Sequence, residues 1–356
     1  DQYANQASGA NVVVVSGQRQ AAQSAQTIKK NAEQVLDSIV ADDIGKFPDK
    51  NVAELLGRIT GVQILHNNGE ASSIVIRGLG GVTTLINGRE MFTAASRSLV
   101  MSDVPVSMLQ RVDVYKSQGA DMVEGGTSGV IDVRTFRPFD FKGEQVAVNA
   151  RAEHRDKAGK TDPQIGGLWS NRWKTSIGDV GLLGGLSYQR GRYFDEAAWA
   201  GQPATYQANG QTVQGADGNG RVMTTGDRKR LAANFSAQWR PNREMQFYAE
   251  GFGTKIDHDS QSIFFVGGLP VYNPASTITT VTENGKNYLS SVSNPSDTSL
   301  VLSSTQARRD WSKGSQLAVG GILDATPTIR LSSELVRTVS TYRQENPIVD
   351  SIYTAP

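Results

Sequence analysis

The chain has 356 residues, of which 38% are hydrophobic and 20% charged, and its formal net charge at pH 7 is +1. This composition is ordinary for a folded protein, and it excludes a disordered chain and a basic surface for nucleic-acid phosphates. The sequence contains no cysteine, which excludes a disulfide framework and a thiolate metal site, and no apolar run reaches the roughly 18 residues of a membrane-spanning helix.

The first 22 residues contain the run Val12-Val13-Val14-Val15-Ser16 beside a tract rich in Gln, Ala and Ser. Four consecutive valines favour extended backbone. Because the flanking tract is polar and flexible, this segment can detach from the body of the protein and pair through its main chain with a strand of another protein. The same residues could instead form the first strand of the following domain.

Residues 23–140 predict a compact α+β domain, with short β runs separated by glycine turns. The apolar positions within Gln23–Val40 and Asn51–Arg58 predict two short helices. Strands are predicted at Ile74–Arg77, Thr83–Ile86, Val112–Tyr115 and Val130–Arg134. Asn87 and Gly88 predict a tight turn after the second of these strands.

Residues 141–356 alternate between apolar and polar side chains, which predicts antiparallel strands with one apolar face. Seven strands are expected, near residues 144–154, 164–176, 180–194, 229–240, 244–257, 303–324 and 328–343. Their connections are alternately short and long, as in a meander that crosses an outer membrane. Aromatic residues near the strand ends fit an interfacial girdle: Trp173, Tyr193, Phe194, Trp239 and Phe247. A soluble β-sandwich would show the same alternation.

Six segments of the N-terminal part form an ordered series of motifs: Val12–Gly17, Asn51–Ile64, Ile74–Gly78, Thr84–Arg89, Leu109–Lys116 and Glu124–Thr135. This series resembles the plug domain of TonB-dependent receptors, in which a hydrophobic energy-coupling box, the TonB box, comes first. Thr60 stands where the family usually has proline, and Asn87 replaces the aspartate of its turn. The run Ile44–Asn51 further resembles a branch common in alphaproteobacteria and xanthomonads.

The resemblance implies a fold and a division of the chain. Residues 1–22 would carry the TonB box at Val12–Ser16, residues 23–140 would form an α+β plug domain, and residues 141–356 would form about seven antiparallel strands of an incomplete transmembrane β-barrel. It also implies location in the outer membrane of a Gram-negative bacterium.

The implied function is TonB-dependent active transport of a scarce nutrient. The partners are the periplasmic domain of TonB, powered by the inner-membrane proton-motive complex, the outer-membrane lipid and a small nutrient ligand. The branch resemblance favours a carbohydrate as the nutrient. Uptake of a ferric siderophore is the alternative, and a soluble β-rich binding module is a third interpretation.

The resemblance also implies two sets of site residues. Arg77 and Lys116 would contact acidic residues of the barrel wall, although both could be ordinary solvated charges. The outward apices of the plug would contact the substrate, at Leu79–Val82 and at His66, Asn67, Asn68, Glu70, Phe92, Ser96 and Arg97. Their polar groups suit hydroxyls and the ring suits stacking, but any exposed loop contains such residues.

Catalytic chemistry has little support in the sequence. His66, His154 and His258 have no metal-ligand spacing, and no nucleophile and base form a recognisable pair. The glycines of Gly119–Thr127 lack the lysine of a phosphate-binding loop. We therefore predict neither enzymatic activity nor a metal or cofactor.

Overall fold

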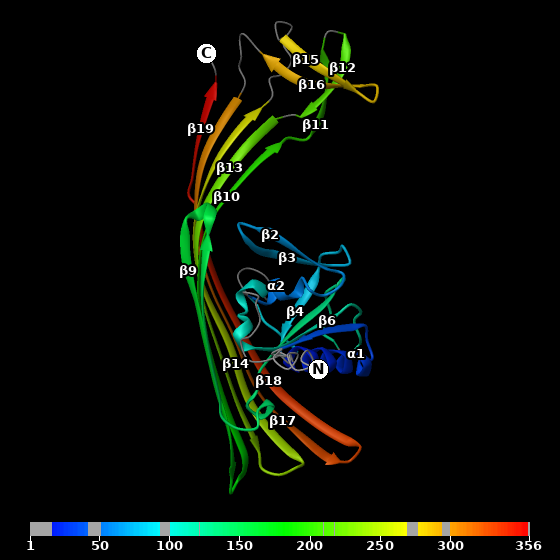
Figure 1. The fold of residues 1–356 in the computed structure, drawn as a ribbon, viewed down its shortest axis with the longest axis vertical. Helices are drawn as coiled ribbons and strands as arrows, with labels where there is room; N and C mark the ends of the chain where they lie inside the picture. Colours follow the sequence, from blue (N-terminus) through cyan, green and yellow to red (C-terminus); the bar gives the residue numbers. More distant parts are fainter. Residues whose placement is uncertain are drawn as a thin grey trace, which may run out of the picture.

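A computed structural model describes residues 16–41, 51–92, 100–120, 122–208, 210–216, 218–268, 277–293 and 300–354. A small N-terminal α+β domain lies against the concave face of a long, curved antiparallel sheet (Figure 1). Within the described ranges, no helix combines the length and apolar character needed to cross a membrane.

The N-terminal domain is built on a five-stranded sheet with the order β1-β6-β7-β4-β5, beside a separate hairpin of β2 and β3. Its elements are α1 (Ser16–Asn31), β1 (Leu36–Val40), α2 (Val52–Leu56), β2 (Val62–Asn67), β3 (Glu70–Ile76), β4 (Val82–Ile86), β5 (Arg89–Glu90), β6 (Leu109–Tyr115) and β7 (Gly129–Thr135). Three 3-10 turns accompany them, at Met101–Asp103, Val106–Met108 and Pro138–Asp140.

The predicted helix over Gln23–Val40 is wrong in its second half. α1 ends at Asn31, and Leu36–Val40 forms the edge strand β1, which pairs antiparallel with β6. The apolar residues of this stretch fit either a helix or a strand over so few positions. The register Ile39↔Val112 buries them against the sheet, so a long-range pairing decides the structure.

The predicted second helix is confirmed as α2. Asn51 caps its N-terminus, because its side-chain oxygen accepts a hydrogen bond from the Glu54 backbone N–H at 3.1 Å. Val52, Leu55 and Leu56 are fully buried in the domain core, which also includes residues of β6 and β7. The core therefore forms between this short helix and the centre of the five-stranded sheet.

Left-handed backbone forms several tight turns, of which two bear on the sequence predictions. Asn87 and Gly88 have φ of 52° and 80°, as the prediction of a turn requires. Arg77 and Gly78 have φ of 53° and 80°, and they join Ile76 to Leu79 through two backbone hydrogen bonds of 3.0 Å. Arg77 is therefore in a turn and not in the strand where it was predicted.

All seven strands predicted for residues 141–356 are present, and several are longer than expected. They are β8 (Gln145–Arg155), β9 (Lys160–Thr175), β10 (Gly178–Ala200), β13 (Gly218–Arg240), β14 (Met245–Gly268), β17 (Leu300–Thr326) and β18 (Ile329–Glu345). They pair antiparallel in this order, and β19 (Ile348–Thr354) pairs with the upper part of β17. A 3-10 turn, Asp156–Ala158, joins β8 to β9.

The two longest connections contain strands that the sequence pattern did not predict. β11 (Pro203–Ala208) and β12 (Gln211–Ala216) lie in one, and β15 (Thr277–Glu283) and β16 (Lys286–Ser293) lie in the other. Together they form a four-stranded sheet at the top of Figure 1, away from the short turns between the long strands. The two connections thus meet above the curved sheet.

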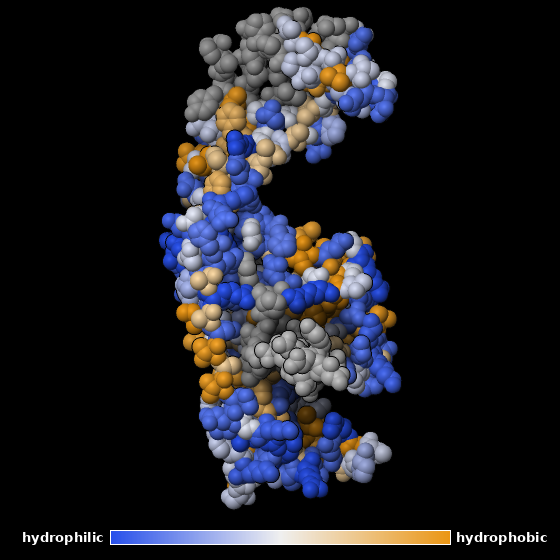
Figure 2. Space-filling model, viewed as in Figure 1, coloured by the Kyte–Doolittle hydropathy of each residue, from blue (hydrophilic) through white to orange (hydrophobic). Residues whose placement is uncertain are grey.

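The curved sheet has a polar concave face and an apolar convex face. Ser187, Gln189 and Gln238 are buried on the side of the N-terminal domain, whereas Leu186 and Phe235 are exposed on the other side. Figure 2 shows hydrophobic residues along the left edge of the lower half of the sheet, with hydrophilic residues above and below them. An exposed apolar band on the outer face of a curved antiparallel sheet is the arrangement of a lipid-facing barrel wall.

Aromatic residues border this band near the short turns, as predicted for Trp173, Trp239 and Phe247. The Trp239 and Phe247 rings stack with centroids 5.4 Å apart, and the Trp239 indole donates a hydrogen bond to the Ile177 carbonyl. The position of Tyr193 differs from the predicted one. It is buried on the concave face, because it has the same strand parity as the inward-facing Gln189.

Candidate functional site

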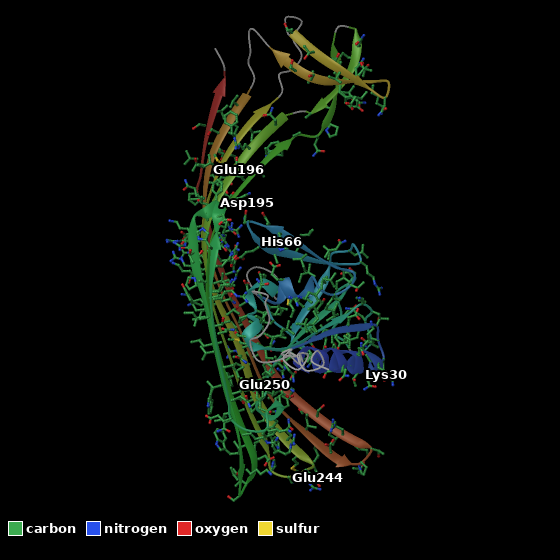
Figure 3. The ribbon with its side chains drawn as sticks, viewed as in Figure 1. Lys30, His66, Asp195, Glu196, Glu244 and Glu250 are labelled. Atoms are coloured by element: carbon green, nitrogen blue, oxygen red, sulfur yellow. The ribbon has the colours of Figure 1, made fainter. Side chains whose placement is uncertain are left out.

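Charged side chains join the N-terminal domain to the curved sheet at two levels. The lower clamp consists of Arg89, Arg137, Glu250 and Glu334, and the upper clamp consists of Glu70, Asp103, Arg155, Arg228 and Arg230. Figure 3 labels Glu250 beside the lower part of the N-terminal domain and His66 near its upper edge. These contacts form the candidate functional site.

In the lower clamp, two arginines of the N-terminal domain meet two glutamates of the sheet. Arg89 contacts Glu250 with Nη1 to Oε2 at 2.8 Å and donates from Nε to Glu334 Oε1 at 2.8 Å. Arg137 Nε lies 2.5 Å from Glu250 Oε1. The Tyr248 hydroxyl donates to Glu334 at 2.6 Å, and both guanidinium groups lie within 6 Å of the Tyr248 ring. One carboxylate is therefore shared by two cations.

Local hydrogen bonds position these arginines. Arg89 follows the Asn87-Gly88 turn, where the Gly88 N–H donates to Asp132 Oδ1 at 2.8 Å and the Asn87 amide donates to Thr135 at 3.0 Å. The Arg137 backbone N–H donates to Asp140 Oδ2 at 2.7 Å. Hydrogen bonds within the N-terminal domain thus position the backbone at both arginines, whose side chains extend to the sheet.

The upper clamp has the opposite polarity, with acids on the N-terminal domain and arginines on the sheet. Arg230 donates to Glu70 Oε2 at 2.6 Å and, through Nε, to Asp103 Oδ1 at 2.7 Å. Arg228 also pairs with Glu70, and Arg155 lies 3.6 Å away. Burial disfavours the charged form of Glu70, but the surrounding arginines outweigh this effect and hold the pKa of Glu70 well below its ordinary value of 4.5.

Glu70 reaches the sheet because it starts β3 directly after a turn at Asn68 and Gly69, whose φ values are 53° and 71°. The turn lies against Tyr193, whose hydroxyl shares a 2.9 Å hydrogen bond with His258 Nε2. His258 Nδ1 in turn lies 3.1 Å from Asp310. The hairpin of β2 and β3 is thus connected to a buried polar network of the sheet.

The two residues predicted to contact the barrel wall have other positions. Lys116 pairs with Asp37 and donates to the Thr60 carbonyl at 2.7 Å, so its contacts lie within the N-terminal domain. Arg77 is exposed in its turn, because left-handed backbone directs the chain back on itself there. The cations of the N-terminal domain that pair with acids of the curved sheet in the lower clamp are Arg89 and Arg137.

The predicted substrate residues separate into three groups. His66, Asn67 and Asn68 lie at the exposed end of the β2–β3 hairpin, where His66 Nε2 is 3.2 Å from Glu54. Glu70 is buried in the upper clamp, and the Phe92 carbonyl lies against Gly314 of β17. Ser96 and Arg97 lie outside the described residues.

The other expected apex, Leu79–Val82, borders a cavity of about 540 Å³ in the N-terminal domain. Gly80, Gly81 and Val82 line it together with Ala71, Thr84 and Met101. Of the predicted TonB box, Val12–Val15 lies outside the described residues, and Ser16 is the first residue of α1. In the described part of the chain, no group of His, Asp and Glu residues has the geometry of a metal site.

Sequence reasoning missed the residues of the curved sheet that form the clamps. A signal was available, because Arg230 and Glu250 are charged residues at inward positions of strands whose alternation was recognised. A charge on the face opposite the apolar band needs a partner, and the N-terminal domain supplies it.

Residues 28–130 match the family model of the TonB-dependent receptor plug domain. The vitamin B12 transporter BtuB of Vibrio cholerae serotype O1 is 28% identical over 150 residues, which are 41% of this chain and 24% of that protein. BtuB of Photobacterium profundum is 27% identical over 149 residues, with 40% and 24% covered. The chain thus spans about a quarter of the length of these relatives.

Among solved structures, the ferric citrate transporter FecA in the unliganded form aligns with 92% of this chain and 60% of its own, at 14% identity and a TM-score of 0.41. The plug match coincides with the domain that carries Arg89 and Glu70, and this domain fills the concave side of a lipid-facing antiparallel sheet. The N-terminal domain is therefore similar to the plug domain of TonB-dependent receptors, which are proteins of the Gram-negative outer membrane.

Proposed function

We propose that the protein performs TonB-dependent active transport of a scarce nutrient across the outer membrane. Residues 1–22 would be the coupling segment, residues 23–140 the plug and residues 141–356 part of the barrel. The plug closes the lumen at rest, and a pull on the coupling segment displaces it. The outer membrane has no ATP or ion gradient of its own, so the energy comes from the inner membrane.

The observation that carries this proposal is the chemistry of the contact between plug and barrel. Ion pairs of the lower and upper clamps join the two parts, while the core that the plug shares with the wall includes Ala232 and Phe252 of the barrel strands. These ion pairs are buried at rest, but displacement of the plug would expose both charges to water, and the pairs would re-form when the geometry returns. A permanently closed stopper would not need such a contact.

The partner is the periplasmic domain of TonB, which would bind Val12–Val15 by strand addition. Main-chain hydrogen bonds would provide most of the affinity, so the valines contribute chiefly by favouring extended backbone. From this segment the chain leads through α1 to β1, which is the edge strand of the plug sheet. An edge strand is hydrogen-bonded to only one neighbouring strand, so it separates from the sheet more easily than a central strand does.

As substrate class we propose an organic metal complex, either a corrinoid or a ferric siderophore. The curated relatives named above are vitamin B12 transporters, and vitamin B12 is a cobalt complex, which supports the class. The carbohydrate prediction depended on the resemblance of Ile44–Asn51, and none of the relatives named above carries a carbohydrate name. The protein acts on this ligand by binding and transport, without catalysis.

A disulfide between plug and barrel tests the transport mechanism. A Cβ at Gly166 of β9 would lie 3.2 Å from the Ser107 Cβ of the plug, near the separation of disulfide-bonded residues, and the chain has no cysteine of its own. In the full-length receptor, we expect oxidised Ser107→Cys/Gly166→Cys to bind ligand but to lose uptake, and reduction to restore it.

The control places the disulfide within the barrel wall, at Ser315→Cys and Val339→Cys, which are opposite each other on β17 and β18. This variant should transport normally when oxidised. Uptake by a fully cross-linked plug variant would refute displacement of the plug.

Binding measurements with purified full-length receptor test the substrate class. Cobalamin, a hydroxamate and a catecholate ferric siderophore, and a maltooligosaccharide are titrated under identical conditions. We expect saturable binding of one of the metal complexes and none of the sugar. Tight binding of the oligosaccharide alone would return the assignment to carbohydrate uptake.

A further inference from the structure

The segment that joins the N-terminal domain to β8 is attached to the curved sheet by aromatic side chains. It comprises residues 136–141 and includes the 3-10 turn Pro138–Asp140. The Phe136 and Phe141 rings have centroids 5.2 Å apart, and they pack with Leu168 of β9 and Leu183 of β10 in a small apolar cluster. This cluster is distinct from the core around α2, so it belongs to the contact between the segment and the sheet.

The Phe139 ring in this segment contacts two cations of the sheet. The Arg172 guanidinium of β9 lies 4.7 Å from the ring centroid, and the Arg240 guanidinium of β13 lies 5.0 Å from it. Each cation has a partner within the sheet, because Arg172 pairs with Asp179 at 2.5 Å and Arg240 donates to Gln246. The ring is therefore held by guanidinium groups that are themselves fixed in position.

Gly181 of β10 allows this turn to lie directly on the sheet. It stands between Arg172 and Gln238 in the strand ladders. A Cβ at Gly181 would lie 2.5 Å from the Pro138 Cβ and 3.0 Å from the Phe139 Cε1. The Phe139 N–H donates a hydrogen bond to Gln238 Oε1 at 2.8 Å. The turn thus contacts the sheet through its backbone as well as its ring.

The contacts of residues 136–141 differ in chemistry from the two clamps. When the clamps separate, their charges become hydrated, which offsets part of the lost attraction. An apolar cluster gains no such compensation, because exposing it to water loses the whole hydrophobic contribution. The chain also limits movement, since only residues 141–144 separate the turn from β8, and an extended chain spans at most about 3.6 Å per residue.

We propose that residues 136–141 stay on the barrel wall during transport and form a junction pivot about which the rest of the plug moves, with Phe139 as its positioning residue. This inference rests on the proposed function, transport by displacement of the plug. Arg137 belongs to the junction pivot, so Glu250 keeps this partner when Arg89 leaves. A buried carboxylate without a cation is strongly destabilising, and the sharing of Glu250 by two arginines avoids that state.

A tether at the junction pivot tests this directly in the full-length receptor. In Pro138→Cys/Gly181→Cys, the 2.5 Å contact needs to widen by about 1 Å to reach the Cβ separation of a disulfide. We expect the oxidised variant to retain uptake, whereas oxidised Ser107→Cys/Gly166→Cys loses it. A loss in the pivot variant that reduction restores would overturn the junction pivot and leave displacement intact. Uptake by both oxidised variants would refute displacement, and the junction pivot with it.

Thiol labelling in transporting cells provides a second measurement that needs no cross-link. Ser107→Cys reports on the moving part of the plug, and Leu183→Cys reports on the wall beneath the junction pivot. Both native side chains are almost fully buried at rest. We expect ligand to raise the rate of maleimide labelling at Ser107→Cys and to leave the rate at Leu183→Cys unchanged. Equal increases at both positions would overturn the proposal.

Substitution of Phe139 tests its positioning role. Combined with Leu183→Cys, Phe139→Leu keeps an apolar side chain but removes the ring face, so ligand-dependent labelling should rise by about fivefold as two cation–π contacts are lost. Phe139→Tyr keeps the ring and should restore protection. Tyr288→Leu, which removes an exposed ring of β16, should have no effect. Unchanged labelling in Phe139→Leu would show that the ring does not position the junction pivot.

Discussion

Glu70 has a role that its position in the sequence did not suggest. It follows the exposed residues His66, Asn67 and Asn68 at the tip of a hairpin, and a carboxylate there was expected to contact substrate. In the structure it is 6% exposed and surrounded by Arg155, Arg228 and Arg230, which are 85 to 160 residues away in the sequence. The polar tip of the hairpin therefore has two parts: His66, Asn67 and Asn68 are at its exposed end, and Glu70 attaches the hairpin to the sheet.

Substitution of this anchor should loosen the hairpin of β2 and β3. Glu70→Gln keeps the shape of the side chain but leaves three arginines without their shared anion, and we expect a loss of about 3 kcal/mol in the stability of the contact. Amide hydrogen exchange of residues 62–76 in the full-length receptor measures it. Glu124→Gln, at an exposed turn position, should leave this exchange unchanged.

The pKa of Glu70 also predicts a pH dependence. Because the pKa is lowered in the folded protein, the ionised carboxylate stabilises the upper clamp fully above the ordinary value of 4.5, and this contribution is lost as the pH falls below that value. Exchange of the hairpin amides should therefore accelerate on acidification from pH 6 to about pH 3, relative to a rigid part of the barrel. Identical pH profiles for the unaltered receptor and Glu70→Gln would contradict this assignment.

At the scale of single elements, the periodicity of the sequence predicted the helices, strands and turns that are determined by neighbouring residues. The seven long strands, α2 and the Asn87-Gly88 turn follow from alternation, capping and turn chemistry. β1 does not, because its five residues, three apolar and two polar, become a strand only through pairing with the edge of β6. The strands of the two long connections form two local hairpins, and the Asn284-Gly285 turn between β15 and β16 was a local signal that the strand prediction did not use.

The Asn87-Gly88 turn links local conformation to the candidate site. Gly88 has φ of 80°, and its N–H donates to Asp132 just before Arg89 enters the lower clamp. Gly88→Ala should cost about 1–2 kcal/mol of plug stability, because a side chain disfavours left-handed backbone. Chemical denaturation monitored on the plug tests this value, with Gly143→Ala as the control at an open position. Equal midpoints for the two variants would show that the turn tolerates a side chain.

The site was the part least accessible from sequence. The resemblance located the plug, and with it the turn that carries Arg89, but it assigned the barrel contacts to Arg77 and Lys116. The side chain of a turn residue points where the backbone φ directs it, and the partner of a lysine depends on which strand lies beside it. Neither can be read from a motif. Charged residues at inward strand positions were the usable signal for Arg230 and Glu250.

For the whole molecule, the proposed mechanism separates ligand binding from energy coupling. Deletion of Val12–Val15 should abolish uptake by the full-length receptor while leaving ligand affinity unchanged, since the segment precedes the described plug elements and belongs to neither clamp. Radiolabelled ligand binding and accumulation in the same cells measure both quantities. Undiminished accumulation would contradict coupling through these valines.

The opposite polarity of the two clamps has a consequence for assembly. A plug that entered the half-formed barrel upside down would bring Arg89 and Arg137 to the arginines of β13, and its own acids to Glu250 and Glu334. Repulsion at both ends would reject that orientation at long range, before any side chain packs. The charge pattern therefore favours a single orientation of the plug during assembly of the receptor.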